Sequence, residues 1–421
     1  MVEGMPYLSH EIKFELGKII REIRQYNYNH YSLGETNPYA KINFIDHHQI
    51  CHYNTYDKLE KGSVIKDDQV YHLLLKKLDL KFNVSETAHQ QNILFFMSII
   101  EDILVGMEYL DDQKLSEIGE KIENQDFTND CIAGVYLNLI QFFLKLYYIK
   151  EIGEDESELI KSYLDIYKGL YKPLALQCLG IYYLTKYKST QCLLYLEEAI
   201  KAYDQCGRDH TVVLPYMLNY YNLKNNFHHL YELSNKLETY YIKKNNQHRL
   251  MHIYGSLFNF HLSINQIELA KEFILKSIEI AKKYANRQLF VMYYNWGYVC
   301  FKQMNYQEAL EYFELALNQS PTKPYLTKLY INIVINLIMT GKDKELILEK
   351  LNEGEPYLEY SHSQMDVEIF KYLKYRYTSP NYYRRFAREH LIPILKKNQH
   401  YKDYLLFIYR NLYQIKANKD D

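Results

Sequence analysis

The chain is poor in residues that interrupt regular structure. Only 15 glycines and 9 prolines occur among 421 residues, far fewer than in disordered or fibrous chains, so we expect a folded protein. Six cysteines are scattered without a CxxC pair, which excludes a disulfide framework and the common zinc motifs. The longest charge-free apolar stretch, residues 131–144, is shorter than the about 20 residues of a membrane helix. These absences predict a cytoplasmic protein without a membrane segment.

An excess of charge of one sign is also missing. The 50 Lys and Arg residues nearly balance the 52 Asp and Glu residues, for a net charge of −2. Any contact with nucleic acid must therefore be local. The sequence contains no GxSxG, HExxH, P-loop or GxGxxG string. We therefore expect no enzymatic activity, no cofactor and no metal site.

Helical periodicity dominates the chain from about residue 88 onward. Apolar residues recur at helical spacing in runs separated by short polar joints, without the alternation of strands, which predicts an all-α fold. The clearest unit, residues 293–321, carries Trp296, Gly297, Tyr306, Ala309, Phe313, Ala316 and Pro321. Gly297 and Ala309 allow two antiparallel helices to approach closely, and Phe313 fills the space beyond them. Pro321 is expected to end the second helix.

The same pattern returns at a period of 39 residues. Stepping back from Ala309 reaches Ala270, Tyr231 and Cys192, each near the start of a second helix. This pattern resembles the tetratricopeptide repeat, although its period exceeds the usual one of about 34 residues. The resemblance implies a right-handed, tetratricopeptide-like α-solenoid over residues 83–421. Such a stack presents a concave groove lined by the first helices of its pairs.

The first 82 residues have a different character. An amphipathic helix over Glu11–Gln25 precedes the segment Ile50–Gly62, ICHYNTYDKLEKG. This segment resembles the XRE-type helix-turn-helix domain of peptide-sensing regulators, with a recognition helix over Tyr53–Leu59. The resemblance implies DNA contacts, in the major groove and at phosphates, by Tyr53, Asn54, Thr55, Lys58, Lys61 and Lys66.

Two departures from the helix-turn-helix pattern leave an alternative open. Residues 26–40 form an inserted loop between the first two helices, and Asp57 stands where the pattern has serine. The first 82 residues also carry 11 basic and 11 acidic side chains, which limits counterion release on DNA. The alternative is an N-terminal helical bundle that does not bind DNA.

The two segments together resemble the RRNPP group of signalling receptors, which includes the Rap, NprR, PlcR and PrgX proteins. The resemblance implies a homodimeric, peptide-responsive transcription regulator that binds double-stranded DNA at a palindromic operator. In this group a short signalling peptide lies extended in the groove, and asparagine amides bind its backbone because an amide both donates and accepts. Asn295 takes the principal position. The predicted peptide-binding residues are Asn222, Asn259, Tyr294, Asn295, Tyr298, Asn332 and Asn336.

Two other interpretations stay open at this point. One is a Rap-like adaptor, whose N-terminal bundle binds a partner protein and is controlled by peptide. The other is a general scaffold without a peptide ligand.

Overall fold

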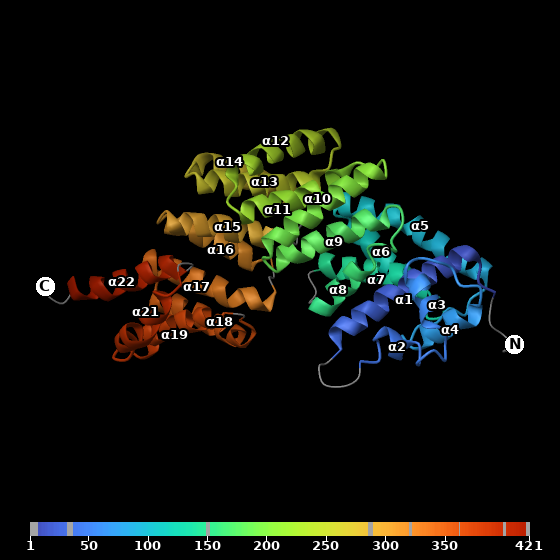
Figure 1. Ribbon diagram of the computed structural model, residues 1–421. Coiled ribbons are helices and arrows are strands. Elements are labelled where there is room, and N and C mark those ends of the chain that lie inside the picture. Colours follow the sequence, from blue (N-terminus) through green and yellow to red (C-terminus); the bar gives the residue numbers. More distant parts are fainter. Residues whose placement is uncertain are drawn as a thin grey trace. The chain divides into compact units, whose positions relative to one another are not determined.

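The computed structural model describes residues 7–31, 37–148, 152–284, 289–319, 322–361, 363–398 and 401–417. Regular structure in these ranges is helical, and the one strand-like feature in them is an isolated bridge between Phe82 and Asp130. The predicted all-α class is confirmed. The chain forms two compact units, Met1–Arg249 and Leu250–Asp421. Helices adjacent in sequence pack side by side within each unit (Figure 1).

The first unit begins with four helices from the N-terminal segment and continues with helix pairs. The N-terminal helices are α1 (His10–His30), α2 (Lys41–Phe44), α3 (Tyr53–Glu60) and α4 (Asp68–Lys76). The following helices are α5 (Glu86–Tyr109), α6 (Asp112–Glu123), α7 (Cys131–Tyr147), α8 (Glu154–Ser162), α9 (Tyr171–Thr185), α10 (Ser189–Gln205), η1 (His210–Val212), α11 (Leu214–Leu223) and α12 (Phe227–Lys243).

Helix α13 (Gln247–Ser263) spans the division between the units, and the remaining helices belong to the second unit. They are α14 (Ile267–Tyr284), α15 (Leu289–Lys302), α16 (Tyr306–Leu317), α17 (Lys323–Met339), α18 (Lys344–Gly354), η3 (Glu355–Tyr360), α19 (Gln364–Thr378), α20 (Tyr383–Phe386), η4 (Ala387–Leu391), α21 (Ile392–Leu395) and α22 (Lys402–Ala417).

The predicted close approach of two helices at Gly297 is present between α15 and α16. A Cβ atom added at Gly297 would lie 3.0 Å from Phe313 Cδ1 and 3.3 Å from the carbonyl oxygen of Ala309. Gly180 on α9 meets Leu196 on α10 in the same way, at 2.6 Å. The glycine that the sequence pattern singled out in residues 293–321 therefore lies at a close contact between two helices. Pro321, predicted to end the second helix, lies outside the described residues.

Helices α10, α12, α14 and α16 begin where the 39-residue period places them. Cys192, Ala270 and Ala309 are fully buried near the starts of their helices. Tyr231 is exposed, and its neighbour Leu230 is buried in its place. The period therefore shifts by one residue in this unit, because Leu230 rather than Tyr231 faces the core.

Short turns with left-handed residues join the helices of several pairs. Asn225 precedes α12, Asn265 precedes α14 and Met304 precedes α16, with φ values of 53°, 59° and 63°. Asparagine tolerates this conformation better than most side chains. Some of the asparagines of this chain therefore occupy turn positions between helices.

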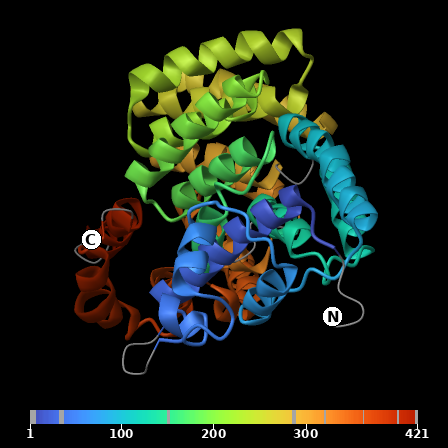
Figure 2. The same ribbon diagram turned by 45° about the vertical axis from the view of Figure 1, so that its right-hand side comes forward.

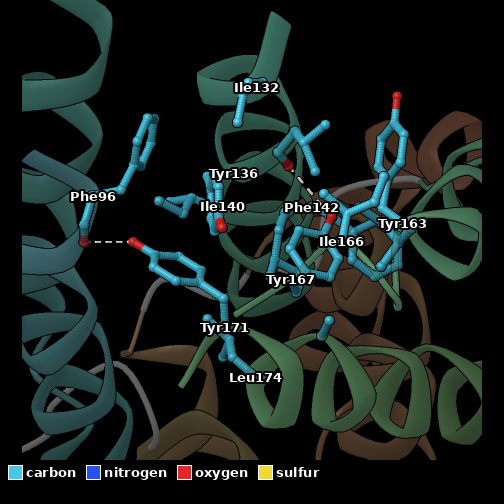
Figure 3. Close-up of a cluster of buried hydrophobic side chains, with 14 of the residues drawn as sticks. Phe96, Ile132, Tyr136, Ile140, Phe142, Tyr163, Ile166, Tyr167, Tyr171 and Leu174 are labelled. Atoms are coloured by element: carbon cyan, nitrogen blue, oxygen red, sulfur yellow. Dashed lines mark hydrogen bonds between the residues drawn. The ribbon is translucent and has the colours of Figure 1, made fainter. Parts of the chain in front are cut away.

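The N-terminal helices share a core with the helices that follow them. Helix α1 packs against α3 and α4 and also against α7 and α8. One buried apolar cluster runs from Leu8 to Met217, and Figure 3 shows the part of it that contains Phe96, Tyr136 and Tyr171. The predicted domain boundary at residue 82 stays a prediction, since residues on both sides of it lie in one compact unit.

The predicted insertion is partly helical. Helix α1 continues to His30, beyond the predicted end at Gln25, so it includes the first residues of the segment 26–40. Residues 32–36 of the insertion lie outside the described residues.

Candidate functional site

The helix predicted to read DNA is α3. It begins at Tyr53 as expected, and the His52 ring accepts a hydrogen bond from the backbone N–H of Asn54 at 3.2 Å, which caps the helix. The ring of His48 accepts from the N–H of Tyr53 at 3.0 Å. These imidazole acceptors satisfy N–H groups that a helix start leaves without a partner.

The predicted DNA contacts are largely accessible. Tyr53, Asn54, Lys58, Lys61 and Lys66 are exposed, and Thr55 is half-buried. The preceding helix α2, however, has only four residues. The helix that directly precedes the predicted recognition helix is thus a single turn.

Acidic side chains hold several cations near α3. Asp57 contacts Lys61 at 2.6 Å and Lys41 at 3.0 Å, and these ammonium groups lower the pKa of Asp57. Arg24 is buried and pairs with Glu60 at 2.7 Å. In the described part of the chain, Lys58 and Lys66 form no such pairs. Both side chains are exposed, so their positive charge is accessible to phosphate.

The predicted peptide-binding residues of the second unit form a hydrogen-bonded cluster. Asn332 on α17 donates from Nδ2 to the Tyr294 hydroxyl on α15 at 3.1 Å. Its Oδ1 accepts from the Tyr404 hydroxyl on α22 at 2.8 Å. Asn336 donates from Nδ2 to the carbonyl oxygen of Asn332 at 2.7 Å. We call Tyr294, Asn332, Asn336 and Tyr404 the asparagine cluster.

The two asparagines of the cluster are buried, and Tyr404 of the C-terminal helix contacts one of them. Asn332 and Asn336 are 0% exposed, so in this structure they face the protein interior rather than an open groove. The Oδ1 of Asn336 has no hydrogen-bond partner among the described residues, which costs about 1–3 kcal/mol for a buried polar atom. Burial also raises the pKa of the Tyr404 hydroxyl well above its usual value.

A second contact holds α22 against α15. The Tyr298 hydroxyl on α15 donates to Asp403 Oδ2 at 3.0 Å, and Lys302 lies 3.8 Å from the same carboxylate oxygen. Tyr294 and Tyr298 stand one turn apart with parallel rings, their centroids 6.4 Å apart. A cavity of about 50 Å³ adjoins Asp403 and Lys302.

A buried carboxyl group lies near the asparagine cluster. Asp366 on α19 has an Oδ1 without a hydrogen-bond partner within the described ranges. Burial raises the pKa of Asp366, and Lys328 and the Tyr401 hydroxyl oppose this shift. The Asp366 charge contributes to raising the pKa values of Tyr294 and Tyr404. Two buried oxygen atoms without a hydrogen-bond partner among the described residues, Oδ1 of Asn336 and Oδ1 of Asp366, thus belong to this region.

The other predicted peptide-binding asparagines are not members of the asparagine cluster. Asn295 is half-buried on α15, and Asn259 is exposed on α13. Asn222 is exposed on α11, in the first unit. The structure therefore brings together Tyr294, Asn332 and Asn336, with Tyr298 on the adjoining turn.

Sequence reasoning missed the contributions of Asp366, Asp403 and Tyr404. A usable signal existed for α22, whose buried residues Tyr404, Phe407, Ile408, Asn411 and Leu412 follow helical spacing. That spacing indicates a packed face. It does not say which helix the face covers.

Neither a metal cluster nor a membrane-spanning helix is found in the described ranges. No group of three or more His, Cys, Asp and Glu side chains among these residues is arranged to hold a metal ion. None of the described helices combines the length and apolar character needed to span a bilayer.

Comparison with solved structures identifies the fold. The apo form of the quorum sensor NprR from B. thuringiensis matches with a TM-score of 0.55 and 16% identity, over 77% of this chain and 94% of that one. NprR in complex with its cognate peptide NprX matches with a TM-score of 0.50 and 16% identity, over 76% and 99%. A Rap protein complexed with Competence and Sporulation Factor gives 0.51 and 14%, over 79% and 98%.

These matches confirm the structural resemblance to Rap and NprR proteins. At such low identity they establish the fold. No known family and no curated protein matches the sequence itself.

Proposed function

We propose that the protein is a peptide-responsive regulator whose second unit binds a short, extended peptide at the asparagine cluster and Asn295. The observation that carries this proposal is the Asn332 amide, which is buried and engaged by two tyrosine hydroxyls. An amide held in this way both donates and accepts. It can make the same pair of bonds to the backbone of an extended peptide, which has unpaired N–H and C=O groups.

The structural neighbours support a peptide as the ligand. One is NprR in complex with its cognate peptide NprX, and another is a Rap protein complexed with Competence and Sporulation Factor. The unsatisfied Oδ1 of Asn336 offers an acceptor that a peptide N–H could fill.

We propose that helix α22 gives this site two states, closed and open. In the state described above, Tyr404 and Asp403 occupy the partners that a peptide needs. Peptide binding therefore requires α22 to leave these partners, and peptide shifts the population toward the open state. The apparent affinity for the peptide is the affinity of the open state multiplied by the fraction of chains that are open.

We propose that the output is transcriptional control by a cytoplasmic homodimer that binds a palindromic operator through α3. Exposure of Tyr53, Asn54 and Lys58 on one short helix supports this output. Half-sites should lie about one helical turn of DNA, or a multiple of it, apart.

The alternative output is a Rap-like adaptor that binds a partner protein. The ion pairs that engage Arg24, Lys41 and Lys61 favour it, because they leave less charge for phosphate. In both cases we expect the protein to be non-catalytic.

Calorimetry with synthetic heptapeptides tests the peptide site. We expect Asn295→Ala and Asn332→Ala each to weaken binding of a selected peptide about tenfold, the loss of one to two hydrogen bonds. Asn318→Ala, at an exposed position that follows α16, should bind normally. Unchanged affinity in both test variants would refute this site.

A further inference from the structure

A groove of about 750 Å³ opens on the first unit between α1, α5 and the segment that leads into α9. The proposed peptide site does not use it. Figure 2 shows α5, in cyan, as a long helix at the edge of this unit. A concave apolar site of this volume is within the range of ligand sites in proteins.

One face of α5 lines the groove from end to end. Its lining positions run from Glu86 through Gln90, Ile93 and Met97 to Glu101, a helical spacing that places them on one face. At 1.5 Å per residue this face is about 22 Å long, or about four helical turns. The groove is therefore long enough for another helix of about four turns to lie along α5.

Two large apolar side chains on this face are exposed to solvent. Leu94 is 64% exposed and Met97 is 63% exposed. They stand beside the buried Phe96 and Ile100. Adjoining apolar side chains exposed along a groove indicate a surface that meets a partner.

The floor of the groove consists of aromatic side chains and has few polar groups that could bind a ligand. Phe96, Tyr136 and Tyr171 pack with ring centroids 5.7 and 4.8 Å apart (Figure 3). The Tyr171 hydroxyl already donates to the carbonyl oxygen of Phe96 at 2.5 Å, and His89 is hydrogen-bonded to Asp130 at 2.9 Å. An extended peptide would leave its own N–H and C=O groups unpaired against this floor, whereas a helix pairs them internally.

The charged lining of the groove is mostly acidic. Four glutamates, Glu11, Glu15, Glu86 and Glu101, accompany one lysine, Lys168. Lys168 forms ion pairs with Glu15 and Glu11, and Glu101 pairs with Arg208 at 2.7 Å. Acidic charge still predominates, and Glu11 is 80% exposed. Electrostatic complementarity selects a cationic partner and disfavours a fatty acid, whose carboxylate would meet these glutamates.

We propose that this groove binds an amphipathic helix of about four turns from a partner protein, with lysine or arginine flanking its apolar face. The apolar face packs on Ile93, Leu94 and Met97, and the cations face Glu11 and Glu86. This surface is separate from the asparagine cluster, so each can be tested alone.

Fluorescence anisotropy with the full chain tests the proposal. The probe is a labelled helix of about 15 residues made of leucine and lysine, with its leucines on one face. We expect saturable binding, and we expect Met97→Ser to weaken it about tenfold, as for the loss of a central anchor. Leu194→Ser, at a 51% exposed position on α10, should leave the affinity unchanged.

Altered probes test the two chemical requirements separately. A peptide with glutamate in place of lysine, and one with the same composition but leucines around the whole helix, should each bind at least about tenfold more weakly. The proposal fails if the leucine–lysine helix does not saturate, or if Met97→Ser and Leu194→Ser bind it equally. It also fails if light scattering shows a dimer that Met97→Ser dissociates, because the occupant is then a second copy of the chain.

Discussion

The Tyr404 hydroxyl donates to Oδ1 of Asn332 over 2.8 Å, across 72 positions of sequence. This bond joins the C-terminal helix α22 to an asparagine that the resemblance to the RRNPP group predicts to bind a peptide. In the proposed function, it connects the predicted ligand residue to a helix that moves before a peptide reaches that residue.

Tyr404→Phe should therefore loosen α22. Loss of one buried donor costs about 1 kcal/mol, which corresponds to about fivefold greater opening of the helix. Hydrogen exchange of α22 amides measures this without any peptide. Tyr409→Phe, on the same helix, is the control and should exchange at the wild-type rate. Equal protection in the two variants would show that Tyr404 does not hold α22.

Lys58→Ala should weaken DNA binding and reduce its salt dependence. Lys58 is exposed on α3, and removing one phosphate contact lowers the slope of log affinity against log salt by about one. Fluorescence polarisation with the DNA upstream of the gene measures both. Lys236→Ala, at an exposed position on α12, is the control. If the wild-type chain shows no salt-dependent binding, the adaptor function is favoured instead.

Gly297→Ala should destabilise the second unit. The new methyl group would meet Phe313 at 3.0 Å and the carbonyl oxygen of Ala309 at 3.3 Å, and overpacking of this kind costs about 1–3 kcal/mol. Gly255→Ala on α13 meets nothing within 4 Å, so it should stabilise the helix by about 0.5–1 kcal/mol. Urea unfolding measures both changes. Similar values for the two variants would contradict the close packing of α15 on α16.

Asp366→Asn should change the pH dependence of stability. Burial raises the pKa of Asp366 in the folded chain, so the folded state holds this proton to higher pH than the unfolded state. The contribution of Asp366 to stability therefore falls as pH rises from its unfolded pKa, near 3.8, through its raised folded pKa. The Asp366→Asn variant has no carboxyl group at this position, so it does not lose stability in this way as the pH rises.

Unfolding of wild type and Asp366→Asn at a series of pH values measures the effect. The variant should gain stability relative to wild type as pH rises above about 4. Glu349→Gln, at an exposed position on α18, controls for the lost charge. A constant difference between Asp366→Asn and wild type at all pH values would contradict the raised pKa.

Much of the fold could be predicted because its signals are local. The helix that begins at Tyr53 and the contact of Gly297 with Phe313 depend on residues close in sequence, and helical spacing alone reveals them. The exposed Tyr231 shows the limit of the period. A single-residue shift in that repeat placed Leu230 in the core, and strict counting could not detect it.

The candidate site could be predicted only in part. Sequence placed Tyr294 and Asn332 on neighbouring repeats, and the structure joins them by a hydrogen bond. The sequence could not show that Asp403 and Tyr404 would cover these two residues. The ligand roles of these residues stay predictions.

The sequence by itself determined the all-helical, repeated architecture, because side-chain periodicity and small residues at fixed spacing act within one helix pair. Only the tertiary structure decided that α22 covers Asn332. It also decided that α1 and α5 line an apolar groove whose charged residues are mostly acidic. Both results depend on contacts between helices far apart in the chain. Many helix faces in this sequence are apolar enough to pack, and only the folded arrangement selects which of them meet.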